Sequence, residues 1–104
     1  MAMAFHGAYA LAALLATGCE TFERHDLVPT GTYEGVIGEV DAGKKEIYVD
    51  AGDKRLELYF TPSTRLVRGE VAVPFSELAV GQRVTVTVRN RGDHLDPETV
   101  RIPD

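Results

Sequence analysis

The chain has few of the residues that cross-link a fold or hold soft metal ions. It contains one cysteine, Cys19, so no disulfide can form within a single chain. It contains no tryptophan, and its two methionines are Met1 and Met3. The sequence after Cys19 therefore has no thiol or thioether, which are the donors that favour Cu(I).

Formal charge is missing from the first 19 residues. All 11 Lys and Arg and all 16 Asp and Glu follow Cys19. The uncharged run from Phe5 to Gly18 is shorter than the roughly 20 apolar residues that a helix needs to cross a bilayer. Its length and its small-residue ending are instead typical of a secretory signal segment.

The end of this run, Ala16-Thr17-Gly18-Cys19, resembles the lipobox of bacterial lipoproteins. The resemblance implies that residues 1–19 are a lipoprotein-type signal peptide up to the lipidated cysteine. It also implies that Cys19 carries palmitate-type acyl chains, which would hold the protein on a membrane because each buried methylene adds about 0.8 kcal/mol. Glu20, rather than Asp, follows the cysteine and favours the outer membrane over the inner membrane. Two alternatives remain open: ordinary secretion, and a structural helix in which Leu11, Leu14, Leu15 and Cys19 pack on the domain.

The remaining 85 or so residues suffice for one domain. Residues 20–31 are polar and mixed in charge, which predicts a tether, although Phe22, Leu27 and Val28 could instead pack on the domain exterior. Residues 32–104 form the predicted domain. The net charge of −5 does not favour nucleic acid or anionic lipid as a partner, since both reward a basic patch.

Apolar and polar residues alternate with period two after Tyr33, which predicts strands. The predicted strands are Tyr33–Asp41, Glu46–Asp50, Lys54–Phe60, Thr64–Arg68, Gln82–Arg91 and Thr99–Ile102, with one helical turn over Pro74–Gly81. In the first strand the alternation puts Val36, Gly38 and Val40 on one face and Ile37 on the other. We expect an all-β fold, a small five- to six-stranded OB-like closed barrel with one short helical turn. The predicted core is Val36, Val40, Ile47, Val49, Leu56, Leu58, Phe60, Leu66, Phe75, Leu78, Val84, Val86, Val88, Val100 and Ile102.

Gly35–Asp41, Glu46–Val49, Thr64–Leu66 and Phe75–Val84 together resemble an OB-like domain of unknown function common in exported bacterial proteins. The layout is also similar to the small periplasmic copper and silver chaperones of efflux systems. Those proteins hold a soft monovalent ion with a His, two Met and a stacking Trp. Because the predicted domain has no Met and no Trp, we expect no site of that type and no cofactor.

Histidine meets carboxylates in two places, His25-Asp26 and the segment 93–98. In the second, His94, Asp96 and Glu98 alternate and are candidate ligands for zinc or a hard cation, although a solvated acidic loop has the same composition. The sequence has no nucleophile elbow, phosphate-binding loop or metalloprotease motif, so we expect no enzyme activity. A metal-binding periplasmic barrel is the alternative function.

Tyr48, Arg55 and Tyr59 are predicted to share the outer face of two adjacent strands. Tyr and Arg are favoured anchors of contact surfaces, so these residues are a candidate docking site for an envelope protein or glycan. Cross-strand tyrosines also stabilise ordinary sheets, and Glu46, Asp50 and Glu57 share the face. We therefore expect a membrane-anchored envelope binding module, with a purely structural subunit as a further alternative.

Overall fold

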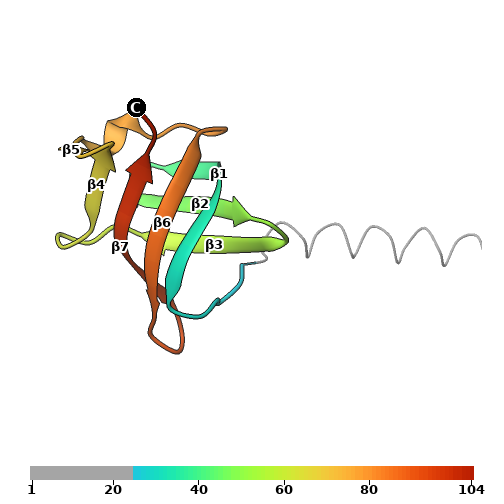
Figure 1. Cartoon of the computed structure of the whole chain (residues 1–104). Coiled ribbons are helices and arrows are strands. Elements are labelled where there is room, and N and C mark those ends of the chain that lie inside the picture. Colours follow the sequence, from blue (N-terminus) through green and yellow to red (C-terminus); the bar gives the residue numbers. More distant parts are fainter. Residues whose placement is uncertain (1–24) are drawn as a thin grey trace, which may run out of the picture.

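A computed structural model describes residues 25–104 (Figure 1). The predicted signal peptide and Cys19 lie outside these residues. None of the helical segments among residues 25–104 has the length and apolarity to cross a membrane. The elements are β1 (Gly31–Asp41), β2 (Glu46–Ala51), β3 (Lys54–Tyr59), β4 (Arg65–Arg68), β5 (Val71–Ala72), the 3-10 turn η1 (Phe75–Glu77), β6 (Arg83–Asn90) and β7 (Leu95–Ile102).

The strands form one sheet in the order β3-β2-β1-β6-β7-β4-β5. A further pairing between β3 and β7, through Leu58 and Leu95, closes β1, β2, β3, β6 and β7 into a barrel. β4 runs parallel to β7 and carries the short β5 at its outer edge. The predicted fold class, an all-β OB-like barrel with one short helical turn, is confirmed.

The core follows the period-two pattern in most strands. Side chains that point into the barrel from β2, β3, β6 and β7 are fully buried because neighbouring strands put alternate residues on the same face. These residues are Ile47, Val49, Leu56, Leu58, Val84, Val86, Val88, Val100 and Ile102. The predicted core omitted four apolar residues that are buried, Val28, Ile37, Val67 and Leu95.

The facing predicted for Val36 is wrong. Val36 is 41% exposed, whereas Ile37 is 1% exposed and lies opposite Val49. The register between β1 and β2 shifts between Ile37 and Glu39, so Gly38 is an extra residue, a β-bulge. Because of this extra residue, Ile37 and Val40 both face the core although they are three residues apart in the strand.

The last strand begins at Leu95 rather than at the predicted Thr99. Pro97 lies within it and is buried. Pairing with β6 passes from Thr99 to Pro97 across a register shift, and an irregular position of this kind is where a strand tolerates proline. Residues 95–98 of the possible loop over 93–98 therefore belong to the strand.

Candidate functional site

The predicted docking residues do share one face of the β2–β3 hairpin. In its register Glu46 pairs with Tyr59, Tyr48 with Glu57, and Asp50 with Arg55. Since Ile47, Val49, Leu56 and Leu58 fill the core, these six residues point to the opposite, outer face. We call the six residues Glu46, Tyr48, Asp50, Arg55, Glu57 and Tyr59 the hairpin face.

Arg55 is held inside this face. Its guanidinium donates two hydrogen bonds to Asp50, from Nε to Oδ1 at 2.8 Å and from Nη2 to Oδ2 at 3.0 Å. The same group lies 5.5 Å from the centre of the Tyr48 ring. Hydrogen bonding to Arg55 lowers the pKa of Asp50, and Asp50 in turn raises the pKa of Arg55. The Arg55 side chain is therefore held against Asp50 and Tyr48, and it positions these neighbours within the hairpin face.

Glu46 and Glu57 form a carboxyl pair beneath the two tyrosines. Glu46 is only 3% exposed, and its Oε2 is buried without a hydrogen-bond partner among the described residues. Burial, together with the neighbouring Glu57 carboxyl, raises the pKa of Glu46. Burial opposes ionisation of Glu57 too, but hydrogen bonds with Glu46 and Tyr48 and the nearby His25 lower its pKa. The pair therefore holds one proton more tightly than two isolated glutamates would.

The tyrosines differ in their roles. The Tyr48 hydroxyl donates a 2.8 Å hydrogen bond to Glu57 Oε2, and burial beside that carboxylate raises the pKa of Tyr48. Tyr59 is 46% exposed, and its hydrogen bond with Glu46 raises its pKa as well. Of the three predicted docking residues, Tyr59 is the one whose ring is presented to solvent.

The described part of the predicted tether, residues 25–31, folds back onto the barrel. The Asp26 amide donates to the Arg55 carbonyl at 2.7 Å, and Asp26 Oδ2 accepts from the Arg55 amide at 2.9 Å. Val28 is buried against the core, whereas Leu27 is 45% exposed. This strap, residues 25–28, continues into β1 at Gly31. Val28 therefore packs on the domain, which was the alternative to a tether at this position, and it does so in the core.

The strap brings His25 to the hairpin face. His25 Nε2 lies 3.6 Å from Glu57 Oε1. A small cavity of about 40 Å³ opens between the strap, β3 and the loop before β7. It is lined by His25, Asp26, Leu27, Glu57, Tyr59, Asp93, His94 and Leu95. His25 stood out in the sequence for its neighbour Asp26, but nothing in its spacing showed which surface the strap would meet.

The three metal-ligand candidates near the C-terminus each have a different neighbour. Asp96 accepts from Arg91 at 3.1 Å, and Glu98 accepts from Arg89 at 2.9 Å. The His94 imidazole contacts Asp93 at 2.6 Å, and this hydrogen bond lowers the pKa of Asp93. Within residues 25–104 no three His, Cys, Asp or Glu side chains are placed so that they could hold a metal ion.

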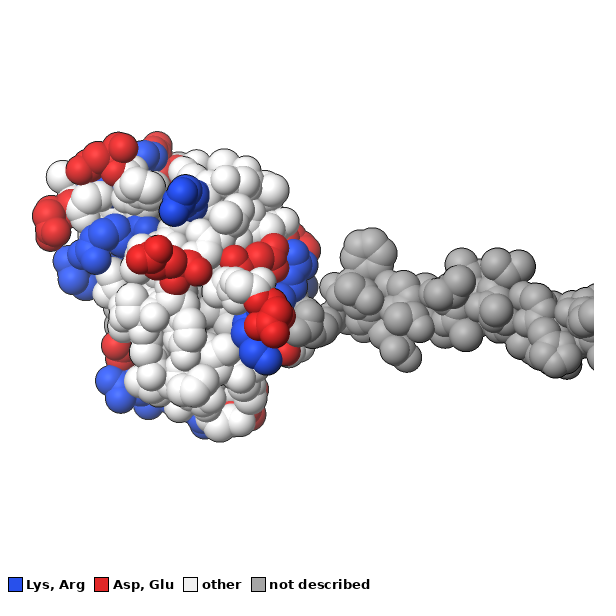
Figure 2. Space-filling model, turned by 45° about the vertical axis from the view of Figure 1, so that its right-hand side comes forward, with Lys and Arg blue, Asp and Glu red and all other residues white. Residues whose placement is uncertain are grey.

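Charge on the molecule is mixed. Figure 2 shows Lys and Arg interspersed with Asp and Glu on the visible face, with no broad basic patch among the described residues there. Ion pairs such as Arg68–Glu77, at 2.8 Å, contribute to this interspersed pattern. The described residues on this face present no basic stripe of the kind that nucleic-acid binding requires.

Comparison with known proteins bears on the fold. No protein-family model matches the chain, and no curated protein matches its sequence. Among solved structures it is similar to Escherichia coli CusF bound to Ag(I), with 15% identity and a TM-score of 0.57 over 75% of this chain and 96% of that one. A Cu(II)-bound variant of Escherichia coli CusF gives 17% identity and a TM-score of 0.55 over 76% of this chain and 99% of that one. The chain thus has the fold of the CusF barrel, and at this identity the likeness concerns the fold alone.

Proposed function

We propose that this chain is a bacterial envelope lipoprotein, anchored through Cys19 in the outer membrane, whose barrel is a non-enzymatic binding module. The lipobox-like end of the uncharged leader supports the anchor. The small closed barrel supports the module, because closure leaves few free strand edges and gives a short chain a rigid surface. The partner is an envelope protein or glycan.

The observation that carries the docking site is the setting of Tyr59. Its half-exposed ring borders the small cavity, which Asp26, Glu57 and Asp93 also line. An accessible tyrosine is a favoured anchor, and the carboxylates favour a partner that presents Lys or Arg. Tyr48 and Arg55 support the site indirectly, because Tyr48 positions Glu57 and Arg55 positions Asp50.

Site-specific photo-cross-linking in intact cells tests this site. A photoreactive phenylalanine analogue replaces Tyr59 in one variant and Val80, which is 66% exposed and remote in sequence, in the control. We expect a discrete cross-linked product from position 59 and none from position 80. Absence of a product at 59, or the same product at both positions, would contradict the site.

Metal binding is the second candidate function, and the shared fold with CusF is the observation that favours it. The described residues contain no Met, Cys or Trp, so their donors do not fit the soft Ag(I) ion. They offer imidazole and carboxylate, which suit zinc. Calorimetric titration of the full chain with Zn²⁺, Cu²⁺, Ca²⁺ and Ag⁺ tests metal binding. Dissociation constants of about a millimolar or weaker for all four ions, at the weak end of protein calcium sites, would contradict this candidate function.

A further inference from the structure

A second concave surface is lined by none of the six residues of the hairpin face. It is an open groove of about 420 Å³ between the β4–β5 hairpin and η1. Its walls are Phe60, Thr64, Arg65, Leu66, Val67, Glu70, Ala72, Val73 and Phe75. This volume falls within the range of roughly 300–1,000 Å³ that small-molecule sites occupy.

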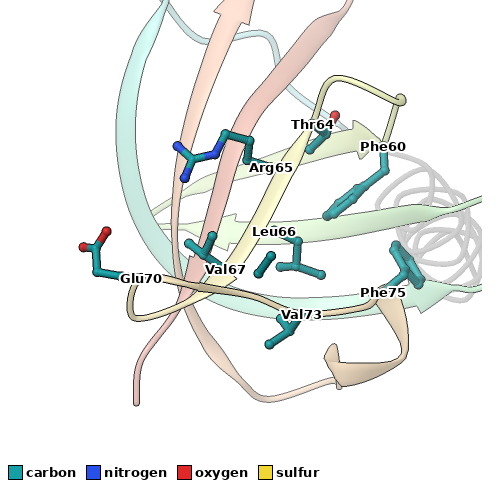
Figure 3. A pocket seen from close by; sticks show the side chains of 9 residues that line it. Phe60, Thr64, Arg65, Leu66, Val67, Glu70, Val73 and Phe75 are labelled. Atoms are coloured by element: carbon teal, nitrogen blue, oxygen red, sulfur yellow. The ribbon is translucent and has the colours of Figure 1, made fainter.

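One end of the groove is aromatic and aliphatic. Phe60 and Phe75 meet edge to face, with ring centroids 5.0 Å apart and an angle of 85° between the planes. Figure 3 shows these rings and the Leu66 side chain converging on this end. Both rings are only partly buried, so an apolar ligand placed here would remove further apolar surface from water.

Charge at the two ends differs. The Lys45 ammonium lies 5.2 Å from the centre of the Phe75 ring and has no carboxylate partner among the described residues. Arg65 and Glu70 both line the other end, where Figure 3 shows them away from the rings. By contrast Arg55, Arg68, Arg89 and Arg91 are each paired with a carboxylate. In a chain of net charge −5, the aromatic end is therefore marked by an uncompensated cation.

We propose that this groove binds a medium-chain carboxylate. The alkyl chain lies over Phe60, Leu66 and Phe75, and the carboxylate lies beside the exposed Lys45 ammonium, which attracts it across a contact open to solvent. The groove shares no lining residue with the cavity at Tyr59, and binding there would give the module a small-molecule ligand besides its macromolecular partner.

Calorimetric titration of the full chain with decanoate tests the proposal, with decanol as the uncharged comparison. We expect saturable 1:1 binding of decanoate and weaker binding of decanol. Phe75→Ala should weaken decanoate binding about tenfold through lost aromatic contact. Lys45→Gln should weaken decanoate binding several-fold and leave decanol binding unchanged. Lys54→Gln, at an exposed lysine that does not line the groove, is the matched control and should change neither.

Ala72→Phe keeps the test decisive if Phe75→Ala fails to fold. Ala72 is exposed at the groove wall, so a larger side chain there fills the groove without disturbing the core. We expect this variant to lose decanoate binding. Absence of saturable binding by the wild type, or equal binding by wild type, Lys45→Gln and Ala72→Phe, would overturn the proposal.

Discussion

The Tyr48 hydroxyl donates a 2.8 Å hydrogen bond to Glu57 across the β2–β3 pair, so a tyrosine that the sequence offers as a contact residue also holds a carboxylate in place. Tyr48→Phe removes this bond and leaves Glu57 with one donor fewer. We expect a loss of about 1–2 kcal/mol in the free energy of unfolding, because hydrogen bonds to charged groups are the stronger ones. Urea denaturation measures it.

Tyr33→Phe is the matched control for this measurement. Its hydroxyl donates to the Pro29 carbonyl at 2.6 Å, which is an exposed bond to an uncharged acceptor. We expect a loss of about 0.5 kcal/mol, at the low end for a neutral hydrogen bond. Equal losses in the two variants would mean that Tyr48 does not support a charged group.

The carboxyl pair predicts a specific dependence of stability on pH. The pKa of Glu46 in the folded state is raised above its ordinary value of 4.5, so its contribution to stability is present below that pH and lost as pH rises through the folded pKa. The pKa of Glu57 is lowered, so its contribution is present above 4.5 and lost as pH falls through the folded pKa. The pair is most stabilising when it holds one proton.

Glu46→Gln isolates the first of these effects because the amide cannot ionise. We expect the free energy of unfolding of the wild type, minus that of the variant, to fall as pH rises from about 4 to about 8. Urea denaturation at a series of pH values provides the comparison. A difference that stays constant or grows with pH would show that Glu46 is not destabilised by ionisation in the fold.

Gly35 lies where β1 passes close to the backbone of β2, which leaves no room for a side chain. A Cβ built on Gly35 would lie 2.5 Å from the Asp50 carbonyl oxygen and 2.8 Å from Val49 Cγ1. Backbone has to move to relieve such contacts, so we expect Gly35→Ala to cost about 1–3 kcal/mol, as overpacking does. Gly43→Ala is the control, since its Cβ would meet Asp41 Oδ1 at an ordinary 3.6 Å. Thermal unfolding compares the two variants, and equal midpoint temperatures would contradict the close approach of Gly35 to the backbone of β2.

Period two was enough to predict the strands whose pairing is regular. In β3 and β6 the buried residues alternate without interruption, and in β2 the inward Ile47 and Val49 are buried together with the outward Glu46. The pattern failed at two irregular places. The bulge at Gly38 exchanges the facing of Val36 and Ile37, and the register shift in β7 accommodates Pro97, which by composition looks like a loop residue. Local spacing does not encode bulges, because they depend on which strand lies opposite.

The candidate site was predictable in its strand residues and not in its strap. Adjacent strands of alternating pattern place Tyr48, Arg55 and Tyr59 on one face, as the structure confirms. The ion pair of Arg55 with Asp50 and the approach of His25 to Glu57 depend on tertiary packing. His25 lies far from Glu57 in sequence, and no local pattern links the two.

Palmitate labelling with membrane fractionation tests the central claim, an envelope lipoprotein, most directly, because the envelope partner follows from the anchor at Cys19. Cells expressing the wild type and Cys19→Ala are labelled with palmitate, and the protein is followed through membrane and soluble fractions. We predict that the wild type carries label and sediments with membranes, and that Cys19→Ala loses both together. A wild type without label would contradict the account and return the barrel to a search for partners outside the envelope.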